Sequence, residues 1–87
     1  MSPERKKALQ NLKTVKGQIE GIIKMIEEDR YCIDISNQLM ASTALLKKAN
    51  LHILSGHMHS CVKHAVEEQN SEEKLKEIED ILAILLK

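Results

Sequence analysis

Residues 31–66, YCIDISNQLMASTALLKKANLHILSGHMHSCVKHAV, decide the fold because they form one long helical pattern without a proline. This stretch holds both cysteines and all four histidines of the chain. Near its far end, His57 and Cys61 are one helical turn apart on the same face, where an imidazole and a thiolate can share one small ion. Cys32, at the start of the stretch, is the third candidate ligand.

The position of Cys32 predicts a site shared by two chains. Cys32 lies 25 positions before His57, and at about 100° per residue the two are only about 20° out of phase, so they share a face. At roughly 1.5 Å per residue they are nevertheless about 37 Å apart along the axis, too far to bind one ion within a single chain. If two copies of a continuous helix pack antiparallel and cross near residues 45–46, Cys32 of one chain comes beside His57 and Cys61 of the other.

Two thiolates and one imidazole in a three-coordinate site suit Cu(I), with Zn the main competitor if a fourth ligand such as water joins. Structural alternatives stay open. A free cysteine such as Cys32 is usually a small buried hydrophobic residue, and a histidine and a cysteine four apart can be neighbours by accident. The other histidines are most simply surface residues (His52, His59 and His64). No phosphate loop or catalytic triad is present in the sequence, so we expect neither an enzyme nor a small-molecule substrate.

Length and composition predict a single domain, residues 1–87, that associates with copies of itself. The chain has 87 residues and Tyr31 is its only aromatic residue, so the core that it can build alone is thin. It has no membrane-spanning apolar run, and no signal-peptide pattern follows the first residues. We therefore expect a cytoplasmic protein without a membrane partner, in which cysteines are thiols or metal ligands.

The pattern predicts an all-α fold with helices over about residues 3–28, 32–67 and 71–86. Ser2 with Pro3 is expected to start the first helix and Asn70 to cap the third. The first helix has one predicted packing seam: Ala8, Leu12, Val15, Ile19, Ile22 and Ile26. The second has a row of mostly small residues suited to tight helix contact: Ile35, Ser42, Ala49 and Gly56.

Two further features of the outer helices suggest contact with other chains or backbones. Gly17 and Gly21 weaken a helix, so we expect them to allow close approach of a neighbouring backbone. The third helix has an apolar face that we expect to dock onto a partner: Leu75, Ile78, Ile81, Leu82, Leu85 and Leu86.

Charge is balanced overall but is unevenly distributed. The formal net charge is zero, which argues against indiscriminate nucleic-acid binding and leaves any DNA contact to one basic face. The lysines that can form that face are Lys6, Lys13, Lys16, Lys47 and Lys48. No helix-turn-helix, zinc-finger or basic-zipper signature is present in the sequence.

Three segments together resemble the CsoR/RcnR family of bacterial metal-sensing transcriptional repressors: LKTVKGQIEGI (12–22), MIEEDRYCIDI (25–35) and HMHSCV (57–62). The resemblance implies three helices per chain, antiparallel pairs that form a four-helix bundle, and two such dimers in a homotetramer. It also implies an operator-DNA partner that is released when the inducer binds.

The residues carried over from the family point to its copper-sensing branch. Cysteine at the start of the second helix, with histidine and cysteine of the other chain, matches Cys32, His57 and Cys61. The same resemblance implies Tyr31 and Glu77 as hydrogen-bond partners of the metal-bound imidazole. Relatives of the nickel/cobalt branch have a histidine in place of Cys61, and those of the persulfide branch lack the histidine at position 57.

One departure concerns DNA. Where relatives have arginines that contact DNA, this chain has Asn11 and Lys48. Asparagine cannot pair with phosphate as arginine can, and lysine offers a point charge in place of a bidentate fork.

The leading hypothesis is a Cu(I)-responsive repressor of copper efflux or homeostasis genes. Two alternatives remain. One is a persulfide sensor that links Cys32 to Cys61 of the partner chain, and the other is a copper-binding helical oligomer without DNA affinity.

Overall fold

The computed structural model contains three helices, and no strand occurs among residues 1–68 and 71–86, the part of the chain that it describes. For residues 61, 65, 68 and 71 the backbone alone is described. The helices are α1 (Pro3–Glu27), α2 (Cys32–Glu68) and α3 (Ser71–Leu85). The all-α prediction is confirmed, and each helix ends within one residue of the expected position.

The first helix begins where its capping residues predict. The Ser2 side-chain oxygen accepts a hydrogen bond from the Arg5 backbone N–H at 3.2 Å, and Pro3 follows as the first helical residue. Serine at this position satisfies one of the unpaired N–H groups of the first turn, and proline lacks the N–H that would otherwise need a partner. The expected cap of α3, Asn70, lies outside the described residues.

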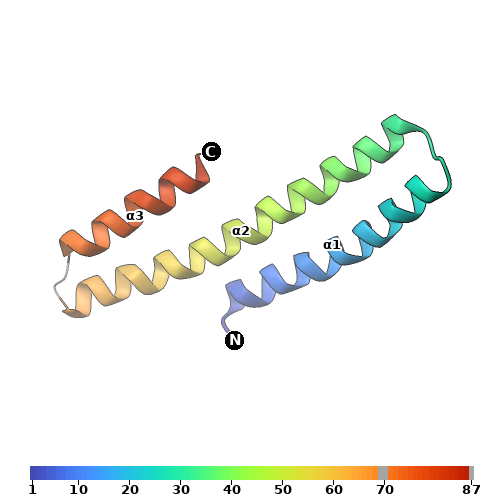
Figure 1. Cartoon of the computed structure of the whole chain (residues 1–87). Helices are drawn as coiled ribbons and strands as arrows, with labels where there is room; N and C mark the ends of the chain where they lie inside the picture. The colour runs from blue at the N-terminus through green and yellow to red at the C-terminus, as the bar shows by residue number, and fades with distance from the viewer. Residues whose placement is uncertain (69–70, 87) are drawn as a thin grey trace.

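A tight turn reverses the chain between α1 and α2. The Arg30 N–H donates to the Met25 carbonyl at 2.9 Å and the Asp29 N–H to the Ile26 carbonyl at 3.2 Å. Asp29 has a φ of 52°, in the left-handed region. This pattern is a Schellman motif, which satisfies the last carbonyls of α1 and ends the helix. The chain then returns antiparallel to α1 (Figure 1).

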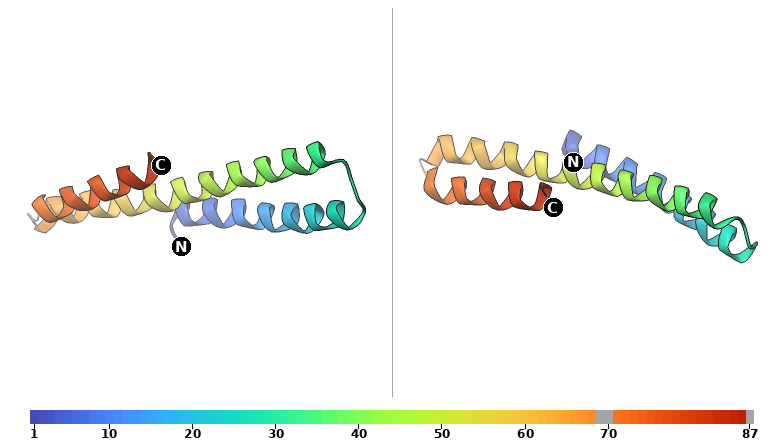
Figure 2. Two further views of the ribbon diagram at one scale, coloured as in Figure 1. Left: turned by 45° about the horizontal axis from the view of Figure 1, so that its top comes forward. Right: turned by 90° about the horizontal axis from the view of Figure 1, so that it is seen from above.

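The long helix α2 carries the other two helices on different halves of its length. Helix α1 packs against the first half and α3 against the second, both antiparallel to α2 (Figures 1 and 2). Among the described residues, no Cα atom of α1 lies within 8 Å of a Cα atom of α3. The N- and C-terminal ends shown in Figure 1 therefore both lie near the middle of α2.

Packing of α1 on α2 corrects the predicted seam of α1. Ala8, Val15 and Ile22 are buried, as expected, whereas the other members of the predicted seam are 45–56% exposed: Leu12, Ile19 and Ile26. The second row of α1 that faces α2 instead lies one position before the exposed residues in each heptad. Its three residues are half-buried: Asn11, Gln18 and Met25.

The predicted small-residue row of α2 is the surface on which α1 packs. Ser42 and Ala49 are buried, and the Ser42 hydroxyl donates to the Gln18 side-chain oxygen at 2.7 Å. A Cβ added at Gly56 would come within 3.1 Å of the Glu4 Cβ. Small residues let the two helix axes approach closely, and the hydrogen bond from Ser42 satisfies Gln18 where it faces inward.

Helix α3 packs on its own chain through part of the apolar face that was expected to dock onto a partner. Ile81 is buried and Ile78 is half-buried. The rest of the predicted face remains at least 37% exposed: Leu75, Leu82, Leu85 and Leu86.

The chain is a thin, elongated layer of helices. Its principal extents are 58 × 27 × 12 Å and its radius of gyration is 17.6 Å, whereas a compact chain of this length has a radius of gyration of about 12 Å. A second layer of helices would need a further 8–10 Å between axes, so the chain forms a single layer. Among the described residues, no helix combines the length and apolar character needed to cross a membrane.

Candidate metal centre

Cys32 is the first residue of α2 and is exposed. The Tyr31 carbonyl accepts the Ile35 N–H at 3.2 Å, which anchors the first turn of the helix beside the thiol. Tyr31 itself is 67% exposed. The simplest structural alternative, a cysteine buried as a small hydrophobic residue, therefore does not describe Cys32 in this chain.

His57 lies on the second half of α2 and is held by α3. Its Nε2 atom is 2.9 Å from the Glu77 Oε1 atom, and the Lys74 Nζ donates to the other carboxylate oxygen of Glu77 at 3.5 Å. The His57 and Glu77 side chains are 50% and 39% exposed, so solvent reaches this pair. Two helices therefore position the imidazole.

The contact with Glu77 determines which nitrogen of His57 can bind a metal. An ionised carboxylate only accepts hydrogen bonds, so Nε2 is the nitrogen that carries the proton when the ring is neutral. The Nδ1 lone pair of His57 is then the one available as a ligand. Metal-binding histidines commonly donate their other ring N–H to a carboxylate in this way.

Cys61 follows His57 by one turn within α2. Positions four apart share a face of a helix, so the backbone places Cys61 next to His57 along the axis. Its side chain lies outside the described part of the structure.

Within one chain, the structure keeps Cys32 and Tyr31 away from His57. Cys32 is the first residue of α2 and Tyr31 precedes it, whereas His57 lies 25 residues further along the same continuous helix. Among the described residues no three potential ligands from histidine, cysteine, aspartate and glutamate come together. A site that uses Cys32 together with His57 therefore requires a second chain.

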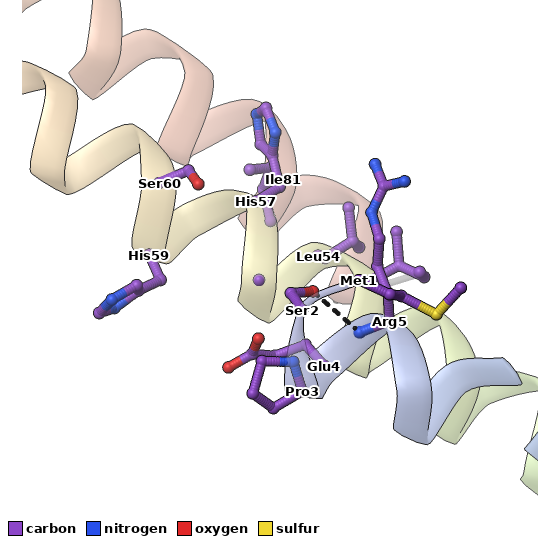
Figure 3. Close-up of a pocket in the computed structure, with 12 residues that line it drawn as sticks. Met1, Ser2, Pro3, Glu4, Arg5, Leu54, His57, His59, Ser60 and Ile81 are labelled. Carbon is purple, nitrogen blue, oxygen red and sulfur yellow. Dashed lines mark hydrogen bonds between the residues drawn. The ribbon is translucent and has the colours of Figure 1, made fainter. Parts of the chain in front are cut away.

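A cleft of about 1020 Å³ opens beside His57, where the start of α1, the middle of α2 and α3 meet. In Figure 3, the side chains of His57 and Arg5, which line this cleft, point toward the top of the view, and those of Glu4 and His59 point toward the left. Glu4 fits there because Gly56 has no side chain. The cleft leaves the space next to His57 open to another chain.

The other histidines were interpreted from sequence as surface residues. His59 and His64 are exposed and His52 is half-buried. Sequence reasoning assigned Lys74 no role, although its position three residues before Glu77 is a spacing at which a lysine and a glutamate on one helix meet.

A comparison with family models decides the class of protein. Residues 4–84 match the model described as "Metal-sensitive transcriptional repressor". The chain belongs to this family. Members of the metal-sensitive repressor family control transcription and are not enzymes.

Named relatives and solved structures of the same family agree with the fold. The chain is 39% identical over 80 residues to the copper-sensing transcriptional repressor CsoR of Bacillus subtilis, covering 92% of this chain and 79% of that protein. The structure superposes on the copper-sensing repressor CsoR with Cu(I) from Geobacillus thermodenitrificans with a TM-score of 0.80 at 34% identity, covering 100% and 91% of the two chains. The nickel-responsive transcriptional regulator InrS gives a TM-score of 0.83 at 29% identity, covering 98% and 93%.

The lysines proposed from sequence as a basic face lie on the antiparallel pair α1 and α2. All five lysines proposed from sequence are exposed: Lys6, Lys13, Lys16, Lys47 and Lys48. Asn11, at a position where the family resemblance led us to expect an arginine, is half-buried, and its Nδ2 atom is buried with no hydrogen-bond partner among the described residues. Because Asn11 faces inward, it is not part of the exposed basic surface in this conformation.

Proposed function

We propose that this repressor senses Cu(I) in the cytoplasm, binds operator DNA, and releases it when copper binds, which derepresses genes of copper efflux and homeostasis. The observation that carries the proposal is the His57–Glu77 contact at 2.9 Å. It leaves Nδ1 of His57 available on the helix face that carries Cys61.

The proposed copper site is shared between two chains, with Cys32 from one and His57 and Cys61 from the other. Soft thiolate ligands favour Cu(I), and a set of two thiolates and one imidazole is compatible with it. The exposed thiol of Cys32 suits a ligand that reaches across an interface. Glu77 orients the His57 ring, and Tyr31, next to Cys32, is the second hydrogen-bond partner proposed for that ring.

A second chain is proposed because one chain cannot cover its apolar residues. The layer is 12 Å thick, and the row that begins with Cys32 continues with three residues that are 45–49% exposed: Leu39, Leu46 and Ile53. Two such layers packed face to face, with their α2 helices antiparallel, bury this row and bring Cys32 toward His57. An antiparallel four-helix-bundle dimer is the proposed unit, and two dimers form the proposed homotetramer.

The names of the relatives support copper as the inducer. The Bacillus subtilis relative is called copper-sensing, and the Geobacillus structure contains Cu(I). The nickel-responsive regulator has a similar fold, so the fold alone does not choose the metal. The two cysteines of the proposed ligand set favour Cu(I) over nickel.

Release of DNA requires copper to bind the DNA-free conformation more tightly than the DNA-bound one, typically by about 1–3 kcal/mol. The contact between His57 on α2 and Glu77 on α3 gives a physical connection between the proposed site and a second helix. The exposed lysines of α1 and α2 are the proposed DNA contacts, so operator affinity should fall steeply as salt rises.

An anaerobic titration of the reduced protein with Cu(I) against a competing chelator tests the site. We expect one ion per chain, because a symmetric dimer contains two equivalent sites, and we expect this binding to be lost in Cys32→Ala. The matched control is Ser36→Ala, an exposed residue one turn further along α2. Weak binding, or binding that does not depend on Cys32, would contradict the copper site.

Gel-shift assays on the DNA upstream of its own gene test the regulatory half of the proposal. We expect a complex that Cu(I) dissociates in the wild type and not in Cys32→Ala. A protein that binds copper but no DNA at any salt concentration would be a copper-binding oligomer instead. Persulfide-driven release that persists in His57→Ala, without release by copper, would identify a sulfur sensor.

A further inference from the structure

A lysine extends the His57–Glu77 contact into a chain of three side chains. The Lys74 Nζ is 3.5 Å from Glu77 Oε2, and Glu77 Oε1 is 2.9 Å from His57 Nε2. Lys74 is the least exposed of the three, at 23%, against 39% for Glu77 and 50% for His57. Polar contacts therefore run from the half-buried Lys74 through the Glu77 carboxylate to the imidazole.

The arrangement holds the Glu77 carboxylate at both of its oxygens. A glutamate side chain has several rotatable bonds, and one hydrogen bond to a half-exposed histidine leaves much of that freedom. The second contact comes from a residue on the same helix, one turn before Glu77. This second contact restricts the orientation in which the carboxylate can point at α2.

We propose that Lys74 is a positioning residue of the metal centre. It holds Glu77 with one oxygen directed at His57 Nε2, and thereby keeps Nδ1 directed toward the metal. This inference rests on the proposed function, because it assigns Lys74 to the same site. Lys74 touches neither the metal nor DNA in this assignment, and its effect passes through Glu77.

The first test uses the metal-free protein. Three-bond scalar couplings report whether the Glu77 side chain occupies one rotamer or several. We expect a single rotamer in the wild type and in the control Lys76→Met, which alters an exposed lysine of the same helix. In Lys74→Met we expect averaged couplings, and in Lys74→Arg, which keeps the charge and the donors, a return toward the wild-type values. Glu77 couplings in Lys74→Met equal to those in Lys76→Met would overturn the proposal.

The second test measures Cu(I) affinity in a double-mutant cycle. Loss of a residue that orients a metal ligand typically lowers affinity by about 10–100-fold, and we expect Lys74→Met to fall near the lower end, about tenfold. In a Glu77→Ala background the same substitution should have no further effect, because Lys74 acts through Glu77. Equal losses in both backgrounds would show that Lys74 does not act through the carboxylate and would overturn the proposal.

The two tests separate failure of this inference from failure of the copper site. If the wild type binds no Cu(I), the proposed function fails, while the Glu77 couplings still decide whether Lys74 positions the carboxylate. If the wild type binds Cu(I) and Lys74→Met retains wild-type affinity, the copper site stands and only the positioning role of Lys74 is wrong. Circular dichroism of each variant checks that the helices are intact, and Lys74→Arg gives the same comparison with a smaller change should Lys74→Met fail to fold.

Discussion

Three glycines occur inside helices, and they differ in what surrounds them. Apart from the backbone of its own helix, a Cβ added at Gly17 or Gly21 would meet no atom of the described residues within 4 Å, whereas at Gly56 it would lie 3.1 Å from the Glu4 Cβ. The close approach that was expected at Gly17 and Gly21 is therefore found, within this chain, at Gly56. Glycine in a helix interior is less stable than alanine by roughly 0.5–1 kcal/mol. Among the described residues, neighbours that would crowd an alanine are found at Gly56 and not at Gly17 or Gly21.

This difference predicts opposite outcomes for the same substitution. Gly17→Ala and Gly21→Ala should each raise the free energy of unfolding by about 0.5–1 kcal/mol, because alanine favours the helix and meets open space. Gly56→Ala should show no such gain, because crowding against Glu4 costs typically about 1–3 kcal/mol. Urea denaturation at one fixed protein concentration measures all three. A loss of stability at Gly17 or Gly21 would instead indicate that a second chain packs there.

At the scale of elements, the turn after α1 contains a residue whose backbone is in a conformation that residues other than glycine rarely adopt. Asp29 has a φ of 52° and occupies the position of the Schellman motif where glycine is most common. Aspartate tolerates this region better than most residues, but its Cβ is still disfavoured there. The turn therefore forms at some cost, offset by the backbone hydrogen bonds from Asp29 and Arg30.

Asp29→Gly should stabilise the protein by up to about 1 kcal/mol, because glycine has no Cβ to disfavour the left-handed conformation. The control is Glu27→Gly, at the last residue of α1, where glycine should destabilise by a similar amount. Thermal unfolding followed by circular dichroism measures both. A lower melting temperature for Asp29→Gly would mean that the aspartate side chain contributes more than its backbone strain costs.

For the whole molecule, its shape is the property that bears most directly on function. The radius of gyration of 17.6 Å and the thickness of 12 Å describe a layer that leaves large apolar side chains exposed on all three helices. Exposed apolar surface of this extent marks an interaction site. The proposed copper site uses the same face, because Cys32 belongs to the same heptad row as Leu46.

Leu46→Glu should dissociate the proposed dimer, because it places a charge in the middle of the exposed apolar row. Sedimentation equilibrium should give a mixture shifted toward the monomer mass, and Cu(I) affinity should fall with it, because Cys32 and His57 then belong to separate molecules. Asn37→Glu is the control, since Asn37 is exposed on α2 and lies nine positions, about half a turn in phase, from Leu46. An unchanged mass for Leu46→Glu would place the dimer interface elsewhere.

Much of this fold was predictable from sequence because its determinants are local. Heptad spacing, the Ser2 and Pro3 start and the absence of proline in residues 31–66 depend only on neighbours along the chain, and they place three helices within one residue of their observed ends. The row of Ser42 and Ala49 was predicted to make tight contact and is buried. For the site, spacing along one helix was enough to infer that Cys32 and His57 cannot meet within a chain.

Only the tertiary structure shows which helix faces are buried and which side chains meet, because both depend on residues that are distant in sequence. Hydrophobic spacing favoured Leu12 and Ile19 as the inward row of α1, but Gln18 faces α2 instead because Ser42, across the interface, donates to it. Lys74 and His57 are connected through Glu77, and this connection exists because α3 packs back on α2. A sequence pattern records which faces of a helix are apolar. Which of those faces is buried depends on the atoms that the fold places opposite, since a polar group is favoured inside wherever a partner satisfies its hydrogen bond.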